Sequence, residues 1–415
     1  MRNVLFVAAL GAAMVACGGG SSGGGSPADA CPAGVHTTVS GIVHAPNGTL
    51  PVSGAWVYVP AGAPPAIPDG TQCRRCGSSP PGAVAWTRTD AVGRFQLSDV
   101  PPGSNVAVVA EIGGWRRQAT VAVTACADTA VPADAIRLPR TSAEGRLPQI
   151  AVSTGASDAL ECVLRKLGVA DSEFGTAGGA ARVHLYAGSG GASVFDAALG
   201  GGAFAPSTDL WASRGALDEY ELVMLSCEGA QNPDTKPAAA LRAMFDHVNA
   251  GGRLLASHWH NYWIASGPAP WPASATFASA LPDLGTIDAA VDLTTARGGA
   301  IADWLLAAGT SSTRGTVTLS SAKHTATAVA AGVEPWLVYA GSSPASVQWF
   351  SFDAPLGAAA AQRCGRVTFT DLHANGGDQS APALAFPSGG CTSTSLSPNE
   401  KVLLLEILEA GRCIE

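Results

Sequence analysis

The spacing of the apolar residues changes near residue 141, and this change restricts the possible folds of the chain more than any other feature. Over 35–140, apolar and polar residues alternate in short runs such as 38–43 and 54–59, with turn residues between them. From residue 147 onward, short apolar strands alternate with segments of helical period. Short alternating strands indicate an all-β sandwich, whereas strand–helix alternation requires a parallel sheet. We therefore expect a β-sandwich domain over 35–140, a linker over 141–146 and an α/β domain over 147–415.

The α/β domain is expected to contain a doubly wound, flavodoxin-like sheet. Its strands are predicted at 149–152, 182–186, 221–226, 253–257, 336–339, 347–352 and 366–370. Helices are predicted over 157–168 and 237–250. A last helix begins at Ser397, whose spacing to Glu400 is that of a capping box, and ends at Gly411.

The N-terminus has the pattern of an export signal peptide, predicted over 1–16. Arg2 precedes an apolar run over 4–15, which is too short to cross a membrane as a helix. The Met-Val-Ala-Cys sequence that ends at Cys17 resembles a bacterial lipobox, so we expect lipidation of Cys17, with plain secretion as the alternative. The Gly/Ser-rich segment within 17–34 then forms a flexible tether. Gly18, rather than Asp, after the lipidated residue resembles lipoproteins of the outer membrane.

The charge balance excludes two classes of partner. The chain has 24 Lys and Arg against 32 Asp and Glu, a formal net charge of −8. Nucleic acids and anionic lipid surfaces are bound by concentrated positive charge, so neither is expected. Hydrophobic residues make up 47% of the chain and charged residues 13%, which favours a folded core over disorder. The expected partners are the membrane, through the lipid anchor, and a carbohydrate or an envelope protein.

An exported chain with ten cysteines is expected to form disulfides. If Cys17 is lipidated, nine candidates remain, an odd number: Cys31, Cys73, Cys76, Cys126, Cys162, Cys227, Cys364, Cys391 and Cys413. We expect Cys31 to pair with Cys126 and Cys73 with Cys76, and Cys227 to be a buried structural thiol or to pair with Cys162. A zinc site from the first four is the alternative, because Cys73 and Cys76 have ligand spacing. The Pro-rich insert 60–81 is expected to project as a rigid loop.

The sandwich is similar to the carboxypeptidase regulatory-like, transthyretin-type domain in four segments, 40–43, 51–55, 89–95 and 100–104. The resemblance implies a domain without catalytic residues that serves as a spacer or as a contact surface for sugars or proteins. Trp56, Trp86 and Trp115 lie on predicted strands, where they either pack against the sheet or form a face that stacks on a ligand.

Polar residues follow several predicted strands of the α/β domain, at the edge where such sheets bind ligands. They are Ser226, Cys227, Glu228, His258, Trp259, His260, Asn261, Tyr262, Trp263, Asp371, His373 and Asn375. The segments 220–225, 249–258 and 365–373 resemble the class I glutamine amidotransferase-like fold, especially its ThuA-like branch. That resemblance places the nucleophile position at His258 and not at Cys227. Cys-dependent glutaminase chemistry is therefore not expected, and His258 and His373 become the matched pair.

Two chemistries are open to these histidines. In an extended stretch, His258 and His260 project to the same side and can join His373 in a zinc site that activates water. Without a metal, Asp371 would orient a histidine that acts as general base. The catalytic candidates are His258, His373 and Glu228, and the cleft candidates are Cys227, His260, Asn261, Tyr262, Trp263, Asp371 and Asn375.

The favoured function is that of a non-enzymatic envelope lipoprotein with no cofactor. Its sandwich and a catalytically degenerate amidotransferase-like domain would bind a carbohydrate polymer or a partner protein. The alternative is a hydrolase that acts on a carbohydrate or an amide through the His-rich cleft, with zinc as the metal.

Overall fold

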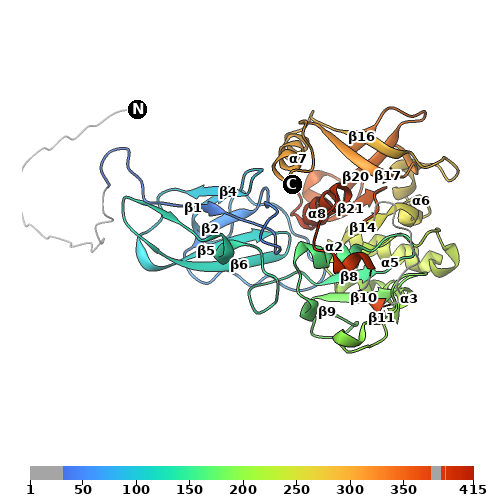
Figure 1. The fold of residues 1–415 in the computed structure, drawn as a ribbon, viewed down its shortest axis with the longest axis horizontal. Coiled ribbons are helices and arrows are strands. Elements are labelled where there is room, and N and C mark those ends of the chain that lie inside the picture. The colour runs from blue at the N-terminus through green and yellow to red at the C-terminus, as the bar shows by residue number, and fades with distance from the viewer. Residues whose placement is uncertain (1–30, 375–384, 388) are drawn as a thin grey trace, which may run out of the picture.

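The computed structural model describes residues 31–374, 385–387 and 389–415. The expected signal peptide, Cys17 and Asn375 lie outside the described residues. The chain forms two lobes, a β-rich N-terminal lobe and a larger lobe built on one mixed sheet (Figure 1). Within the described residues, no helix is long and apolar enough to cross a membrane.

The N-terminal lobe consists of two sheets that share one apolar core. Its strands are β4 (Arg94–Leu97), β1 (Thr38–Ile42) and β7 (Asp128–Ala130) in one sheet, and β3 (Ala83–Arg88), β2 (Trp56–Pro60), β5 (Gly103–Ile112) and β6 (Trp115–Val123) in the other. In β4, Phe95 and Leu97 are buried while Arg94 and Gln96 are exposed, which is the period of two on which the prediction rests. The expected β-rich fold is present, and its transthyretin-type assignment stays a prediction.

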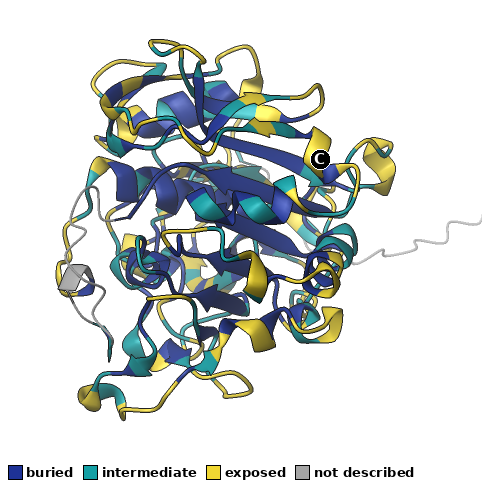
Figure 2. Ribbon diagram, turned by 90° about the vertical axis from the view of Figure 1, so that its right-hand side faces the viewer, coloured by how far each residue is buried: buried dark blue, intermediate teal, exposed yellow. Residues whose placement is uncertain are grey.

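The second lobe is organised by a sheet of eleven strands in the order β12, β10, β8, β13, β14, β21, β20, β19, β16 and β17, with β9 beside β10. These strands are β8 (Ile150–Ser153), β9 (Phe174–Gly175), β10 (Val183–Ala187), β12 (Ala205–Pro206), β13 (Leu222–Leu225), β14 (Arg253–Ser257), β16 (Gly285–Val291), β17 (Thr316–Ala322), β19 (Glu334–Tyr339), β20 (Ser346–Ala354) and β21 (Gly365–Thr370). Figure 2 shows that its central strands are buried.

The sheet is parallel in one half and antiparallel in the other. Neighbours from β12 to β21 run parallel, whereas β21, β20, β19, β16 and β17 pair antiparallel. The expectation of a parallel sheet is therefore wrong for the second half. The second half is antiparallel because its connections are short. The segment 340–345, which joins β19 to β20, is too short for the helical crossover that parallel neighbours require.

Helices cover both faces of the sheet. Leu254 of β14 belongs to the apolar cluster of α5 (Ala238–Asn249), and the next residue, Leu255, to that of α8 (Pro398–Gly411), so the two helices lie on opposite faces. The predicted capping box of α8 is present, since the Ser397 hydroxyl accepts from the Glu400 N–H. The remaining elements are α1 (Ala133–Ile136), α2 (Leu160–Leu167), α3 (Ser207–Leu210), α4 (Arg214–Asp218), α6 (Tyr262–Ala265), α7 (Ala296–Ala307), β11 (Val194–Phe195), β15 (Ala275–Phe277), β18 (Ala326–Val329), β22 (Ala385–Phe386), η1 (Asp171–Glu173), η2 (Ala197–Leu199), η3 (Pro233–Thr235), η4 (His258–Asn261), η5 (Trp271–Ala273), η6 (Ala360–Gln362) and η7 (Gly389–Thr392).

Four disulfides are present, and only part of the expected pairing is correct. They are Cys31–Cys126, as expected, and Cys73–Cys364, Cys76–Cys413 and Cys162–Cys391. The expected Cys73–Cys76 and Cys162–Cys227 pairs are wrong, and a zinc site from the first four cysteines is excluded because all four are oxidised. Cys227 is the free cysteine of the described residues. The disulfides indicate an oxidising, extracytoplasmic environment.

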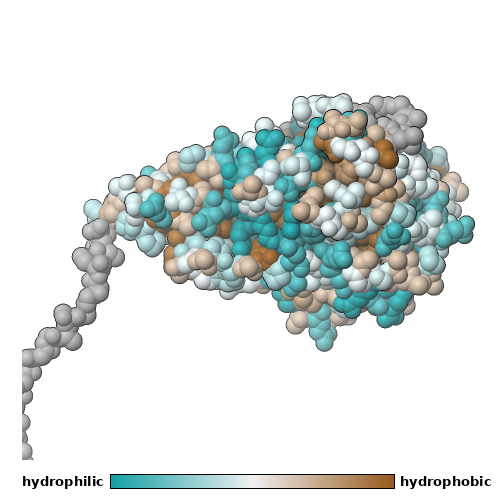
Figure 3. Space-filling model, turned by 90° about the horizontal axis from the view of Figure 1, so that it is seen from below, coloured by the Kyte–Doolittle hydropathy of each residue, from teal (hydrophilic) through white to brown (hydrophobic). Residues whose placement is uncertain are grey.

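The insert 60–81 does not project, because it lies against the second lobe. The Cys76 N–H donates to the Ile414 carbonyl, and the Ile414 N–H donates to the Arg74 carbonyl. The Trp304 indole of α7 also donates to the Pro51 carbonyl, so a second contact joins the lobes. Seen from below, hydrophilic side chains gather along the junction between the lobes (Figure 3). Covalent and polar contacts therefore hold the lobes together, and one buried apolar cluster extends through both of them.

Candidate functional site

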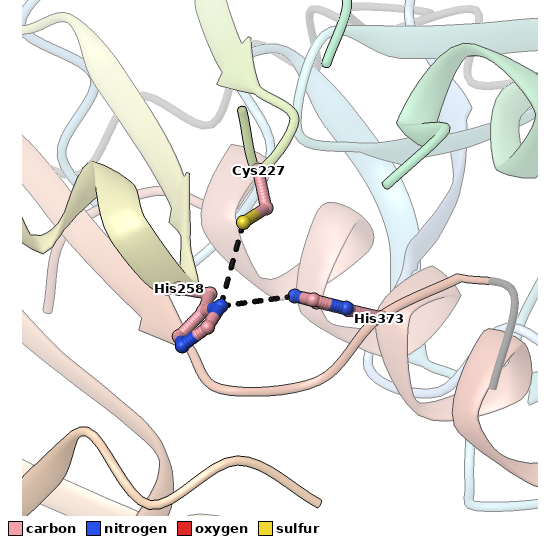
Figure 4. A group of neighbouring side chains, drawn as sticks. All are labelled: Cys227, His258 and His373. Carbon is pink, nitrogen blue, oxygen red and sulfur yellow. Dashed lines mark hydrogen bonds between the residues drawn. The ribbon is translucent and has the colours of Figure 1, made fainter. Parts of the chain in front are cut away.

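Three side chains converge at the carboxyl ends of three adjacent strands. Cys227 follows β13, His258 follows β14 and His373 follows β21. Cys227 Sγ lies 3.4 Å from His258 Nδ1, and His373 Nε2 lies 3.2 Å from the same nitrogen (Figure 4). All three side chains are buried. The expectation that the site lies at the strand ends agrees with this placement, and His258 and His373 are in contact.

The backbone at His258 is strained. Its φ of 44° lies in the left-handed region, which costs a non-glycine residue about 1–3 kcal/mol. The residue directly follows β14 and is the first of η4, so the strand turns sharply at this point into the helical segment. This is the strand-to-helix turn at which the amidotransferase resemblance placed the nucleophile position. At this turn the imidazole faces Cys227 and His373 (Figure 4).

Burial keeps all three groups neutral. It lowers the pKa of His258 to about 3, with a further contribution from Lys323, and it lowers the pKa of His373 well below its usual value. It raises the pKa of the Cys227 thiol to about 12. A thiolate–imidazolium pair, which a Cys nucleophile needs, is therefore disfavoured. Neutral imidazoles, by contrast, keep the lone pair that a metal ion requires.

We predict that Cys227 in the folded, metal-free protein resists iodoacetamide at neutral pH, because its thiol is fully buried and protonated. Mass spectrometry after alkylation with and without urea measures this, since Cys227 should be modified only in urea. Fast, selective modification of the native protein that disappears in His258→Ala would instead demonstrate a Cys–His nucleophile.

Two distances within the cluster are close to those of a tetrahedral zinc site. With Zn–N of about 2.0–2.1 Å and Zn–S of about 2.3 Å, the edges of a tetrahedral site measure about 3.3–3.6 Å. The two edges that meet at His258 Nδ1 measure 3.4 Å and 3.2 Å, and all three donor atoms lie within 4.8 Å of one another. An imidazole nitrogen has one lone pair, so hydrogen bonding satisfies only one of its two neighbours. A shared metal ion would satisfy all three atoms.

His260 does not belong to this group, so the expected set of His258, His260 and His373 is corrected. The segment after β14 is helical rather than extended, and successive side chains therefore point in different directions. The Trp263 indole donates to His260 Nδ1 at 3.1 Å, and His260 Nε2 lies 3.0 Å from the Ser226 carbonyl. Both ring nitrogens are in use. Cys227, which sequence reasoning treated as structural, takes the place of His260.

The carboxylates that were expected to assist the histidines have other partners. Glu228 Oε2 accepts from Lys236 Nζ at 2.7 Å, and Asp371 Oδ2 accepts from the Thr325 and Ala326 N–H groups. Among the described residues, neither joins the group of converging donor atoms. The expected roles of Glu228 as a catalytic residue and of Asp371 as orienter of a histidine therefore lose their geometric basis.

The remaining cleft candidates directly after His260 are one amide and two aromatic residues, and they have other partners or pack in the core. Asn261 accepts from Gln231 Nε2 at 2.9 Å. Trp263 is buried and packs edge-on against Trp211 with ring centroids 5.1 Å apart, so this cleft candidate is part of the core. Tyr262 opens α6 and is partly buried.

Asp158 connects the backbone segments that carry the two histidines, and the sequence analysis did not identify it. Its Oδ2 accepts from the Ser257 hydroxyl at 2.7 Å, and its Oδ1 accepts from the Ala374 N–H at 2.8 Å. Ser257 precedes His258 and Ala374 follows His373. Burial raises the pKa of Asp158 to about 6. It follows β8, so searching after the first strand as after the others would have found it.

We predict that Asp158→Ala weakens zinc binding about 10–100-fold, because the backbone beside both histidines loses its shared anchor. Asp158→Asn, which keeps one acceptor oxygen, should restore part of the loss. Asp171→Asn, which removes an ion pair with Arg165 at the other end of α2, is the matched control. Competition with a chromogenic chelator measures the affinity. Equal affinities for Asp158→Ala and wild type would refute the positioning role.

A pocket of about 300 Å³ opens onto the two histidines. It is lined by Ser157, Gly229, His258, Trp259, Ala278, Ser279, Leu281, Asp283, Lys323, His324, Thr325 and His373. Lys323 Nζ lies 2.6 Å from Asp283 Oδ2, so a cation and an anion flank the entrance. A small polar molecule fits the space beside His258 and His373.

Comparisons with known proteins give little further help. No family model and no curated protein matches the sequence. Among solved structures, a ThuA-like protein from Bacteroides uniformis is similar over 63% of this chain and 91% of its own, at 11% identity and a TM-score of 0.33. A type II cohesin–X-dockerin complex from Acetivibrio cellulolyticus is similar over 32% of this chain and 85% of its own, at 20% identity and a TM-score of 0.18. The functional argument therefore rests on the site.

Proposed function

We propose that the second lobe is a zinc-dependent hydrolase, in which Cys227, His258 and His373 hold the metal. The observation that carries this proposal is the proximity of one sulfur and two nitrogen atoms, which all lie within 4.8 Å of one another, with two of the separations close to the edges of a tetrahedral zinc site. The non-enzymatic binding function, favoured on the sequence alone, offers no reason for such convergence.

The number of ligands supports catalysis over a structural role. Structural zinc sites are closed by four protein ligands, whereas catalytic sites use three and keep a fourth position for water or substrate. Among the residues that the structure describes, three candidate ligands converge, and a pocket reaches two of them. Zinc supplies an activated water and polarises a carbonyl group. The chain itself would contribute two neutral imidazoles and the Cys227 sulfur, which would lose its proton to solvent when it binds zinc, together with the anchoring by Asp158 and the enclosure of the substrate.

The test is metal-dependent hydrolysis. Protein stripped of metal and then reconstituted with zinc is assayed on chromogenic amides and glycosides, the two substrate classes that the sequence suggests. Activity that requires zinc and disappears in His373→Ala, but survives in His324→Ala, supports the proposal. His324 lines the same pocket but its Nε2 lies 3.0 Å from the Pro344 carbonyl. Hydrolysis that is unaffected by zinc removal would contradict the proposal.

We further propose that a lipid on Cys17 tethers the protein to the outer membrane, as the lipobox resemblance implies. Labelled palmitate should enter the wild-type protein, and Cys17→Ser should abolish the label and release the protein or leave its precursor. Autoradiography of a gel measures the label, and detergent extraction of the membranes measures whether the protein is released. Label that persists in Cys17→Ser would disprove anchoring through this residue.

A further inference from the structure

A second pocket, unrelated to the metal site, lies at the junction of the two lobes. It has a volume of about 370 Å³. Its walls come from β2, β3, the insert 60–81 and the end of α8, with Trp56, Arg74, Arg75, Arg88, Glu111 and Arg412 among the lining residues. The disulfides Cys73–Cys364 and Cys76–Cys413 border it and fix the insert to the second lobe. The pocket is therefore preformed, at a kind of position that often binds ligands.

The charges that line this pocket are unbalanced. It holds four arginines and one glutamate. Glu111 is already engaged, since its carboxylate lies 2.7 Å from Arg116. Arg74 pairs with Glu221, and Arg412 pairs with Glu409. Arg75 and Arg88 have no ion-pair partner among the described residues, and Glu409 and Glu415 act on Arg88 only from a longer distance, so positive charge predominates in the pocket lining.

Arg88 carries much of that charge. Within the described residues it has no carboxylate partner in ion-pair distance, and its Nη1 donates only to the Gly54 carbonyl, at 3.0 Å. A Cβ on Gly54 would meet the Arg412 guanidinium, so the two guanidinium groups flank this glycine. Burial and the neighbouring Arg412 lower the pKa of Arg88. Two cations on either side of one backbone position are stabilised by a bound anion.

One aromatic residue, Trp56, lines the same pocket, and Trp86 lies next to it outside the lining. Trp56 and Arg88 are opposite residues of β2 and β3, so their side chains share one face of the sheet. The Arg88 guanidinium lies 3.7 Å from the Trp56 ring centroid, and the Trp86 ring, which is 47% exposed, meets Trp56 edge-on at 5.5 Å. Aromatic rings beside an arginine suit a ligand that has both an apolar face and a carboxylate.

We propose that this pocket between the lobes binds an acidic sugar, with its carboxylate held by Arg88 and Arg412 and its ring against Trp56. Sugar rings have an apolar face, and uronic acids place a carboxylate at its edge, so a uronic acid meets both requirements of the pocket. The negative net charge of the whole chain, −8, does not oppose this, because the arginines concentrate positive charge locally. This inference does not depend on the metal site.

Isothermal titration calorimetry of the mature protein, with both lobes present, measures the binding of glucuronate, glucose and acetate. Glucuronate should bind more tightly than either control, because glucose lacks the carboxylate and acetate lacks the ring. Arg88→Gln should weaken the binding of glucuronate roughly tenfold or more, and Arg88→Lys, which keeps the charge, should weaken it less. Arg94→Gln, at an exposed arginine of β4 in the same lobe, should leave it unchanged.

Three outcomes would overturn the inference. They are no saturable binding of glucuronate, equal binding of acetate and glucuronate, and glucuronate binding that Arg88→Gln leaves intact while the variant unfolds at the wild-type temperature. A loss of zinc binding with intact glucuronate binding would affect only the hydrolase proposal.

Discussion

Replacing Cys73 and Cys364 by serine is expected to lower the free energy of unfolding by about 4 kcal/mol. With Cys76–Cys413 intact, the lost bond closes a ring made of residues 73–76 and 364–413, and the loop-entropy relation for a ring of this length gives about 4 kcal/mol. Urea unfolding, followed by tryptophan fluorescence and by far-ultraviolet circular dichroism, measures the change.

Removing both inter-lobe disulfides should also separate the unfolding of the two lobes, so that the two probes no longer report one transition. Cys31→Ser with Cys126→Ser is the control, because that bond closes within the N-terminal lobe and leaves both inter-lobe bonds in place. Disulfide mapping of the native protein provides the independent check. A peptide that links Cys73 to Cys76 would contradict the structure.

Removing any one ligand of the proposed metal site is expected to lower zinc affinity at least hundredfold. A zinc ion held by protein side chains is bound with about 10–16 kcal/mol, so one ligand accounts for roughly 3 kcal/mol or more. Cys227→Ser, His258→Ala and His373→Ala should all show this loss in a chelator competition assay. Each variant's melting temperature distinguishes loss of a ligand from loss of the fold.

His260→Gln is the matched control for these variants. His260 lies two residues from His258, but both of its nitrogens contact Trp263 and Ser226, so zinc affinity should stay near that of the wild type. If His260→Gln loses zinc while Cys227→Ser keeps it, the metal set expected from the sequence alone would be correct and the one proposed from the structure wrong.

Local sequence signals predicted much of the second lobe. The strand predicted at 253–257 is present with the same bounds, as β14, and α8 begins after its Ser397 capping box and ends at Gly411. These elements were predictable because apolar runs, caps and glycine stops act within a few residues. The edge of the sheet that carries the site was also predictable, since polar residues follow β13, β14 and β21.

The composition of the site could not be predicted, because it depends on backbone geometry at one residue. Treating the segment after β14 as extended placed His258 and His260 on one side, whereas the left-handed turn at His258 begins a 3₁₀ helix and turns His260 towards Trp263. Cys227 was not expected to be a nucleophile, because it lies one strand before His258, the nucleophile position that the amidotransferase resemblance implies. The same position brings its sulfur next to His258, where we propose it as a metal ligand.

Disulfide pairing also depends on contacts between distant segments. Cys73 and Cys76 are close in sequence, yet each pairs with a cysteine of the second lobe, because the insert 60–81 lies along the end of α8. Such pairing cannot be deduced from spacing. The insert, expected to project, instead connects the lobes and forms one wall of the arginine-rich pocket.

X-ray absorption at the zinc edge tests the central claim most directly. The mature protein, purified from its exporting host and reconstituted with zinc, should bind the metal in stoichiometric amount. We expect one sulfur ligand at about 2.3 Å and at least two nitrogen ligands at about 2.0–2.1 Å, with the sulfur absent from the spectrum of Cys227→Ser. Zinc that does not bind, or that binds in a shell without sulfur, would contradict the assignment of Cys227, His258 and His373 as a metal site.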